Sequence, residues 1–243
     1  MENRRSLKQI VGTYIIPKLP MSRETFEKVR YELNAVYVSI NNSINPYYIA
    51  RLNRHRNKNN LSVNVGAGPF GQEGWTNIDM FKFKNISFPY DCRKKLPFRD
   101  NTVDRIRAEH VFEHLDKKEE APKFLSECLR CLKPDGTLRI VVPDLELFIN
   151  AYKTGTAEAW KSLGFDIDNL PGGLVTPMDI LNYTFRQNGE HKYAYDFATL
   201  RYTVMNAGFK DVTKVSFGVS ADPMLRADQE VHRNYSLYAD CTK

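Results

Sequence analysis

The sequence predicts an α/β fold, a doubly wound arrangement in which helices cover both faces of a mostly parallel sheet. From residue 61 onward, short apolar runs alternate with segments of helical periodicity, which is typical of such sheets. Residues 137–142 form a nearly continuous β-branched run, as expected of a central strand buried on both faces. The first run, residues 61–65, leads directly into a glycine-rich turn. These observations predict a main domain over residues 61–243.

The strands and helices of this domain follow from apolar runs and their end signals. A helix is expected from about Ala121, because Pro122 fits only a first turn, to the residue before Lys133. A later helix begins after Asp196, a capping residue, and ends at Gly208. The expected strands are 61–65, 76–80, 86–90, 103–108, 137–142, 211–217 and 236–242.

An insertion interrupts this pattern at about residues 154–195. Residues 145–153 have helical character, whereas residues 154–178 are rich in turn signals such as Pro171-Gly172-Gly173 and predict loops. Long insertions of this kind often cover a binding site. We therefore expect a substrate lid.

Residues 1–60 predict a helical appendage and a basic linker. Phe26, Val29, Leu33 and Val36 recur at helical spacing, so a helix of about 23–40 has one apolar stripe to bury on the main domain. The basic stretch at 51–58 has two interpretations, a solvated linker or a patch for phosphate or nucleic acid.

Composition limits the cellular setting and the cofactors. The net charge of +6 permits a nucleic-acid partner without requiring one. The chain has neither an apolar run of membrane-spanning length nor a signal peptide, so we expect a cytoplasmic protein with no membrane span. Its four cysteines are too sparse for a disulfide framework. They also lack partners at metal-binding spacing, and no metal site is predicted.

The glycine-rich turn is the main indication of chemistry. Gly66 to Gly71 satisfies the dinucleotide pattern G-x-G-x-x-G, but two spacings argue against a nicotinamide cofactor. Only seven residues separate Gly68 from the next strand, too few for the helix that would hold a pyrophosphate. Asp79 lies thirteen positions after Gly66, whereas the ribose-binding acid of a dinucleotide fold is expected about 20 residues beyond the motif. A ligand with a ribose and no pyrophosphate, such as S-adenosylmethionine, suits this spacing better.

A series of motifs resembles a known family. Val65-Gly66-Ala67-Gly68, Gly74 to Asp79, Leu96 to Asp104, Glu109 to His114 and Cys131 to Leu138 follow one another. Together they resemble class I S-adenosylmethionine-dependent methyltransferases, and among these the type 11 group. The likeness is strongest over residues 61–144.

The resemblance implies a seven-stranded sheet of order 3-2-1-4-5-7-6 with the seventh strand antiparallel. It also implies that S-adenosylmethionine lies across the carboxyl ends of the first strands. The implied cofactor contacts are Gly66, Ala67 and Gly68 at the methionine moiety, Asp79 at the ribose, Asp91 and Cys92 at the adenine, and Glu109 and His110 at the sulfonium and the acceptor. Asn64 departs from the family, because many relatives have an acid there. The connection after the first strand is short, so residues 1–60 are expected to cover the cofactor on that side.

Methyl transfer is an in-line displacement, which depends mainly on aligning donor and acceptor. A base is required only when the acceptor must lose a proton, and histidine suits that role near neutral pH. The candidate catalytic residues are His191 and His110, with Asp144 as an orienting group or alternative base.

The acceptor has three interpretations. Aromatic and polar residues of the insertion favour a small molecule or a carbohydrate. The basic stretch at 51–58 leaves open a nucleic-acid-binding protein or an RNA methyltransferase, whose binding would weaken steeply with salt. A nicotinamide-dependent oxidoreductase or epimerase is disfavoured by the two spacings.

Overall fold

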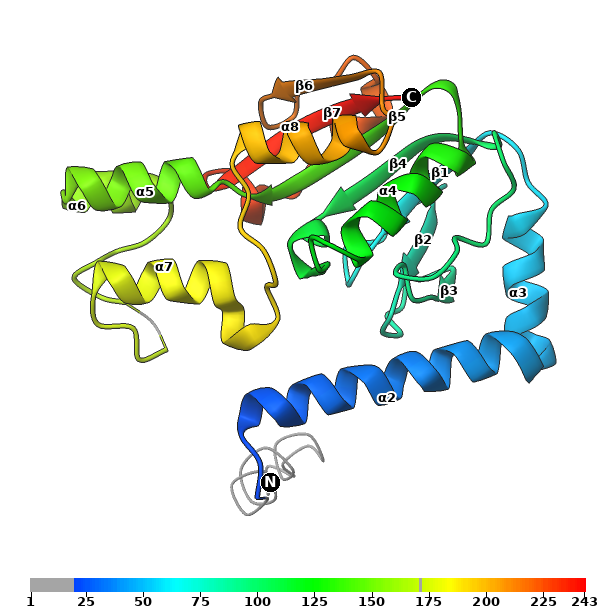
Figure 1. The fold of residues 1–243 in the computed structure, drawn as a ribbon, viewed down its shortest axis with the longest axis horizontal. Coiled ribbons are helices and arrows are strands. Elements are labelled where there is room, and N and C mark those ends of the chain that lie inside the picture. Colours follow the sequence, from blue (N-terminus) through cyan, green and yellow to red (C-terminus); the bar gives the residue numbers. More distant parts are fainter. Residues whose placement is uncertain (1–19, 171) are drawn as a thin grey trace, which may run out of the picture.

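A computed structural model describes residues 20–170 and 172–243 of the chain. Its centre is a seven-stranded sheet of order β3-β2-β1-β4-β5-β7-β6 (Figure 1). The first five strands pair in parallel, and β7 is antiparallel to both of its neighbours. The strands are β1 (Leu61–Val65), β2 (Thr76–Asp79), β3 (Phe88–Pro89), β4 (Val103–Glu109), β5 (Leu132–Pro143), β6 (Asp211–Val215) and β7 (Ser236–Thr242). The predicted strand order is confirmed.

The helices surround this sheet and extend beyond one end of it. They are α2 (Arg23–Ile44), α3 (Pro46–Arg56), α4 (Glu120–Cys131), α5 (Leu145–Thr154), α6 (Ala157–Ser162), α7 (Pro177–Arg186) and α8 (Phe197–Asn206). In the part of the chain that the structure describes, short 3-10 helices join them: η3 (Phe112–His114), η4 (Gln187–Gly189), η5 (Pro223–Leu225) and η6 (Glu230–His232). Within the described residues, no helix is long and apolar enough to cross a membrane.

Strand β3 is shorter than the run 86–90 predicted. It pairs with β2 only through Phe88 and Pro89. Proline has no N–H to donate to a ladder, so it is tolerated at a sheet edge and ends regular pairing there. The carboxyl end of β3 therefore opens early into the loop that carries Asp91.

The basic stretch forms a helix that is docked on the sheet. Asn45 caps α3 by accepting a hydrogen bond from the Tyr47 N–H. Arg51 then donates to the Ile86 carbonyl at 2.8 Å, and His55 Nδ1 lies 2.9 Å from the Thr76 hydroxyl. A solvated linker would not make these contacts. The first nineteen residues of the predicted appendage lie outside the described residues.

One face of the sheet packs against α4 and α8 in an apolar core. Ile106 and Ala108 of β4 are fully buried there with Phe124 of α4 and Leu200 of α8. Asp196 caps α8, as predicted, by accepting from the Thr199 N–H at 2.7 Å. Two amphipathic helices on one apolar face account for the main core.

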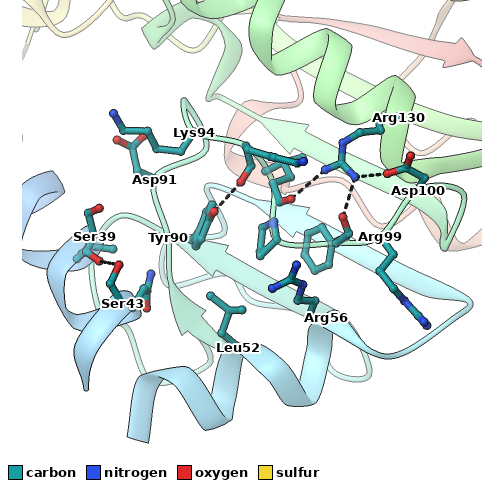
Figure 2. A pocket seen from close by; sticks show the side chains of 16 residues that line it. Ser39, Ser43, Leu52, Arg56, Tyr90, Asp91, Lys94, Arg99, Asp100 and Arg130 are labelled. Carbon is teal, nitrogen blue, oxygen red and sulfur yellow. Dashed lines mark hydrogen bonds and ion pairs between the residues drawn. The ribbon is translucent and has the colours of Figure 1, made fainter. Parts of the chain in front are cut away.

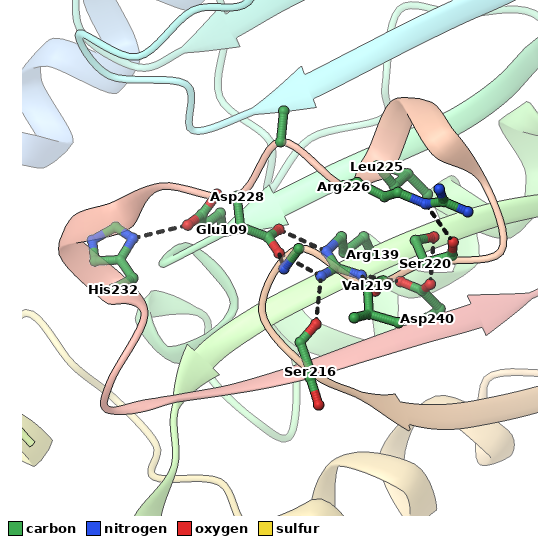
Figure 3. A network of polar contacts seen from close by, with 12 residues as sticks. Glu109, Arg139, Ser216, Val219, Ser220, Leu225, Arg226, Asp228, His232 and Asp240 are labelled. Atoms are coloured by element: carbon green, nitrogen blue, oxygen red, sulfur yellow. Dashed lines mark hydrogen bonds and ion pairs between the residues drawn. The ribbon is translucent and has the colours of Figure 1, made fainter. Parts of the chain in front are cut away.

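The opposite face of β4 and β5 carries arginines, because alternate residues of a strand point to opposite sides. Arg107 and Arg139 are almost fully buried, and residues 216–232 cover them (Figure 3). The buried Asp228 carboxylate accepts from Arg139 Nη2 at 2.6 Å and Nε at 2.8 Å, and from Arg107 Nη2 at 3.3 Å. Asp240 of β7 accepts a hydrogen bond from Arg139 Nη1 at 2.7 Å. Charge pairing holds this layer in place where an apolar helix would otherwise pack.

The insertion forms a lobe with its own small core. Phe148 of α5, Trp160 of α6 and Ile180 of α7 are fully buried together. Helix α6 lies within a stretch predicted as loops, where Trp160 and Leu163 supply the apolar contacts that stabilise a short helix. Pro171 lies outside the described residues.

Helix α2 runs across the carboxyl ends of β2 and β3 (Figure 1). Asn34 donates to the Met80 carbonyl at 3.0 Å and Asn42 to the Pro89 carbonyl at 2.9 Å. Ala35 and Val38 pack on Met80 in a separate apolar cluster. The start of the helix reaches η4, because a Cβ placed on Gly189 would meet the Glu24 side chain at 2.5 Å. Helix α2 thus covers the carboxyl ends of β2 and β3 and extends to the lobe.

The charged layer makes a testable prediction about stability. We expect Asp228→Asn to lower the free energy of unfolding by about 3–5 kcal/mol, because it removes the buried carboxylate that two buried guanidinium groups share. Urea unfolding followed by circular dichroism measures this. Asp135→Asn is the matched control, since its ion pair with Lys210 lies on the surface, and we expect it to cost about 0–1 kcal/mol. Equal costs for the two variants would contradict the assignment.

Candidate active site

The glycine-rich turn follows β1 at the centre of the sheet. Gly66 and Gly68 both adopt positive φ, at 64° and 49°, where a side chain is strained. A Cβ on Gly66 would lie 2.1 Å from Val111 Cγ2. Residues 66–75 form turns with no helix, and β2 begins at Thr76. The backbone therefore passes close under the loop after β4, and no helix N-terminus is available for a pyrophosphate.

Asp79 stands where this turn meets the end of β2. Its Oδ2 accepts from the Gly68 N–H at 2.9 Å, and its Oδ1 accepts from the Phe81 N–H at 2.7 Å. Burial raises the pKa of Asp79, and the two backbone N–H groups counteract that effect. The side chain is only half-buried. Each oxygen keeps a further lone pair, so the carboxylate both holds the turn and can accept from a ligand.

Asn64 is buried in β1 and belongs to an amide network. Its Nδ2 donates to Asn77 Oδ1 at 3.3 Å, and Asn77 Nδ2 donates to the Gln72 carbonyl at 2.8 Å. The Gln72 N–H returns a bond to Asn77 Oδ1 at 2.9 Å. Two neutral amides thus brace the far side of the glycine turn. An acid at position 64 would place a buried negative charge beside Asn77 Oδ1, and the neutral side chain avoids that cost.

Asp91 follows β3 and is buried beneath α2. Arg93 donates to it through Nε at 3.0 Å and through Nη2 at 2.9 Å. Arg93 Nη1 also reaches Glu32 of α2 at 2.6 Å. Cys92 is partly buried against the main core, and burial raises the pKa of its thiol to about 12. All four cysteines are free.

The end of β4 carries Glu109 and His110, and a third residue joins them. His232 of η6 lies with Nδ1 3.0 Å from Glu109 Oε1, which also accepts from the Gln229 N–H at 3.1 Å. The rings of His110 and His232 stack with centroids 3.7 Å apart. His110 has a φ of 52°, so the backbone leaves the extended conformation of β4 there and its side chains no longer alternate between the two faces of the sheet. The two adjacent residues therefore both contact His232, and Figure 3 shows the contact between His232 and Glu109.

A second cluster lies one turn further along the chain. The His110 Nδ1 lies 3.2 Å from Glu113 Oε1. His191 comes from the segment after η4, and its Nε2 lies 3.9 Å from the same Glu113 oxygen. The Glu113 carbonyl accepts from the N–H groups of Lys192 and Tyr193 at 2.8 and 3.2 Å. The structure therefore brings together the two predicted catalytic histidines, His110 and His191, on either side of Glu113.

Asp144 occupies a different position, at the start of α5. It caps this helix by accepting from the Glu146 N–H at 3.0 Å, and its other oxygen lies 3.5 Å from Lys214 Nζ. Its own N–H donates to the Tyr235 carbonyl at 2.9 Å. The structure gives Asp144 contacts that position the lobe and the loop before β7.

A cavity of about 890 Å³ lies to one side of these groups, at the β3 edge (Figure 2). It is bounded by α2, α3, residues 90–100 and Arg130. Asp91 is the one predicted site residue on its wall, and the glycine turn is not part of it. Several basic side chains face it, but Arg130 is held by Asp100 at 2.7 Å and by the Phe98 carbonyl at 2.8 Å. This cavity therefore adjoins the predicted cofactor position and does not contain the histidine clusters.

Sequence reasoning missed His232, Tyr235 and Ser236. Tyr235 lies edge-on to both stacked histidines, and Ser236 Oγ lies 2.9 Å from His110 Nε2. Burial raises the pKa of Tyr235 to about 12, so its phenol is neutral near pH 7. These residues precede or begin β7, more than a hundred positions after His110. Their only signal in the sequence is that an antiparallel β7 beside β5 brings its first residues to the carboxyl end of β4.

Sequence comparison relates part of this chain to known methyltransferases. A family model described as a methyltransferase domain, of type 11, matches residues 82–140. The ubiquinone/menaquinone biosynthesis C-methyltransferase of Pseudomonas paraeruginosa is 30% identical over 129 residues, which are 53% of this chain and 46% of that protein. The chain thus spans about half the length of the curated relative it matches.

Solved structures of similar proteins include two SAM-dependent methyltransferases. The protein from Thermotoga maritima is 15% identical, with 91% of this chain and 97% of that chain covered and a TM-score of 0.46. The protein from Archaeoglobus fulgidus is 18% identical, with 85% and 99% covered and a TM-score of 0.45.

The strand order and the sequence matches together support a class I, S-adenosylmethionine-dependent methyltransferase domain. S-adenosylmethionine is the cofactor of this class. The resemblance that the motifs predicted is confirmed.

The glycine turn makes the second prediction. Gly66→Ala should lower the free energy of unfolding by about 1–3 kcal/mol more than Gly74→Ala, because only the first change drives a Cβ into Val111. Gly74 is the matched control, since it also has a positive φ and has nothing within 4 Å of the position that a Cβ would take. Thermal unfolding of the two variants measures the difference. Equal midpoints would show that the loop after β4 does not press on the turn.

Proposed function

We propose that this protein transfers the methyl group of S-adenosylmethionine to a small-molecule or carbohydrate acceptor at the carboxyl edge of the sheet. The observation that carries the proposal is the link between Gly68 and Asp79, which joins a turn without side chains to a half-buried carboxylate. It lies beside the point where the strand order reverses, between β1 and β4. Ligands of open α/β sheets bind at this position.

The residues of this edge suit each part of the cofactor. In the proposal Gly66, Ala67 and Gly68 lie along the methionine moiety, where a side chain would obstruct the ligand. Asp79 accepts from the ribose hydroxyls with the lone pairs that its two backbone contacts leave free. Asp91 and Cys92, at the end of β3, border the adenine.

Helix α2 supports this placement because it covers the same edge. Its contacts with Met80 and Pro89 lie directly after the ends of β2 and β3. Glu32 also fixes Arg93, which in turn holds Asp91. The helix therefore replaces the cover that the short connection between β1 and β2 does not supply.

The acceptor is proposed to meet the cofactor at the histidine clusters. The bound cofactor supplies an electrophilic methyl group, and the protein has to align the acceptor with it. Glu109 and His110 lie at the end of β4, and His232 and Tyr235 present polar edges beside them. Such a mixture of aromatic and hydrogen-bonding groups suits a polar small molecule or a sugar. His110 is the side chain that we propose contacts the acceptor, with Glu113 and Ser236 orienting its ring.

The alternative functions have less support. Arg51 and His55 of the basic stretch are used in docking α3. This leaves a small surface for nucleic acid, whose exposed basic residues are Arg54, Arg56 and Lys58. The turn after Gly68 has no helix to receive a pyrophosphate, which argues against a nicotinamide cofactor.

Asp79 gives the test of the cofactor site. We expect S-adenosylhomocysteine, the demethylated product, to bind the wild-type protein, and Asp79→Asn to weaken this binding by about 10- to 100-fold. That corresponds to the loss of charged hydrogen bonds of about 1.5–3 kcal/mol. Isothermal titration calorimetry measures the affinity, with Asp135→Asn as a surface control. If NAD stabilised the wild-type protein against thermal unfolding and S-adenosylhomocysteine did not, the proposal would be wrong.

Helix α2 gives a second test. Ala35→Asp places a charge in the buried contact with Met80, where Ala35 is 6% exposed. We expect it to detach the helix and to weaken binding of S-adenosylhomocysteine by roughly tenfold, or about 1.4 kcal/mol. Val36→Asp is the matched control, because Val36 is 55% exposed on the neighbouring face. Unchanged affinity in Ala35→Asp, with the helix shown to be loosened by proteolysis, would reject a covering role.

A further inference from the structure

Three side chains beside the proposed acceptor position form a group of potential metal ligands. Within the described residues, Glu113, His114 and His191 each offer a ligand atom, and these atoms all lie within 4.8 Å of one another. They come from η3 and from the segment after η4, which are 77 positions apart in the sequence. The hydrogen bonds from Lys192 and Tyr193 to the Glu113 carbonyl hold the two segments together.

The carboxylate of this group is buried, and its Oε1 lies 3.2 Å from His110 Nδ1 without a well-formed hydrogen bond. The Glu113 side chain is 2% exposed, and among the described residues neither of its oxygens accepts a hydrogen bond. Buried carboxylates without such partners are costly and usually mark a function. The carboxylate lies beside the imidazole rings of His114 and His191, with one ligand atom of each within 4.8 Å of the others.

Both histidines are held in the form that a metal ion needs. His114 Nδ1 lies 3.1 Å from the Glu190 carbonyl, and His191 Nδ1 lies 2.6 Å from the Thr184 carbonyl. A carbonyl accepts, so each Nδ1 carries the proton and each Nε2 keeps its lone pair. Metal-binding histidines are oriented in this way.

We propose that Glu113, His114 and His191 bind a divalent transition-metal ion, with Zn²⁺ as the expected occupant. Two imidazoles and one carboxylate suit zinc and its neighbours in the first transition row, whereas Mg²⁺ and Ca²⁺ prefer oxygen ligands throughout. Three protein ligands leave a coordination position open for water or a substrate oxygen. Tetrahedral bonds of about 2.0–2.1 Å require ligand atoms roughly 3.3 Å apart, so the side chains must close inward by about 1 Å.

Zinc binding to the full-length protein tests this inference. After treatment with a chelator and dialysis, Zn²⁺ is titrated against a chromophoric competitor, and we expect one site per chain. Glu113→Gln and His191→Asn should weaken binding by roughly a hundredfold or more, since loss of even an outer contact costs about 10–100-fold. His55→Asn is the matched control. His55 is also part-buried and lies at the amino end of β2, beside Thr76, whereas the proposed ligands lie at the carboxyl ends of the strands. Its affinity for zinc should equal that of the wild-type protein.

Further measurements keep the result independent of folding and of methyl transfer. Circular dichroism shows whether each chelator-treated variant is folded, and His114→Asn replaces His191→Asn if the latter unfolds, because the His114 hydrogen bond is more exposed. Co²⁺ should give visible absorption in the wild-type protein that these variants lose. Equal zinc affinity in the wild-type protein and in folded ligand variants overturns the inference. S-adenosylhomocysteine binding is measured in parallel, so failure of the cofactor site and failure of the metal site are separate outcomes.

Discussion

The burial of Asp228 between Arg107 and Arg139 is the interaction on which the arrangement of this protein depends. Two guanidinium groups lie on the face of β4 and β5 that points away from α4 and α8. An apolar helix cannot cover them, because both would then lose a buried carboxylate partner. Residues 216–232 supply the carboxylate and cover them. The N–H of the next residue, Gln229, donates to Glu109 Oε1, and His232 Nδ1 lies within hydrogen-bond distance of the same oxygen. One ion-pair network thus positions a wall of the proposed active site.

A second constraint acts on the cofactor side of the sheet. Gly66 has to be glycine because Val111, from the loop after β4, fills the place of its Cβ. The turn is then bound to β2 through Asp79 and braced by Asn64 and Asn77. Because the same loop after β4 continues into Glu113 and His114, packing at the glycine turn and the placement of the second histidine cluster are linked. Helix α2 joins the two regions by reaching from Met80 to Gly189.

Much of the fold could be predicted because local signals agree with the global pattern. The run 137–142 is a buried central strand, and Asp196 and Gly208 bound α8 as capping chemistry requires. Other features were missed where the signal is not local. Pro89 shortens β3 only because β3 is an edge strand. The sequence of α3 is also compatible with a linker, because the contacts that stabilise the helix, such as that of Arg51 with the Ile86 carbonyl, are made with distant parts of the chain. The arginines of β4 and β5 gave no indication of burial, since their partner Asp228 is about 90 to 120 positions away.

The amino-acid sequence by itself predicted the glycine turn, the acid that follows it and the class of cofactor, because each depends on spacing along one or two neighbouring strands. The strand order followed from the resemblance of the motifs to class I methyltransferases. The tertiary structure alone decided which histidines meet. Glu113 and His114 come from one loop, His191 from the lobe and His232 from the segment before β7. These segments approach only because parallel strands align their carboxyl ends and an antiparallel β7 delivers its beginning to the same edge. Side-chain constellations assembled in this way leave no periodic signal in the chain.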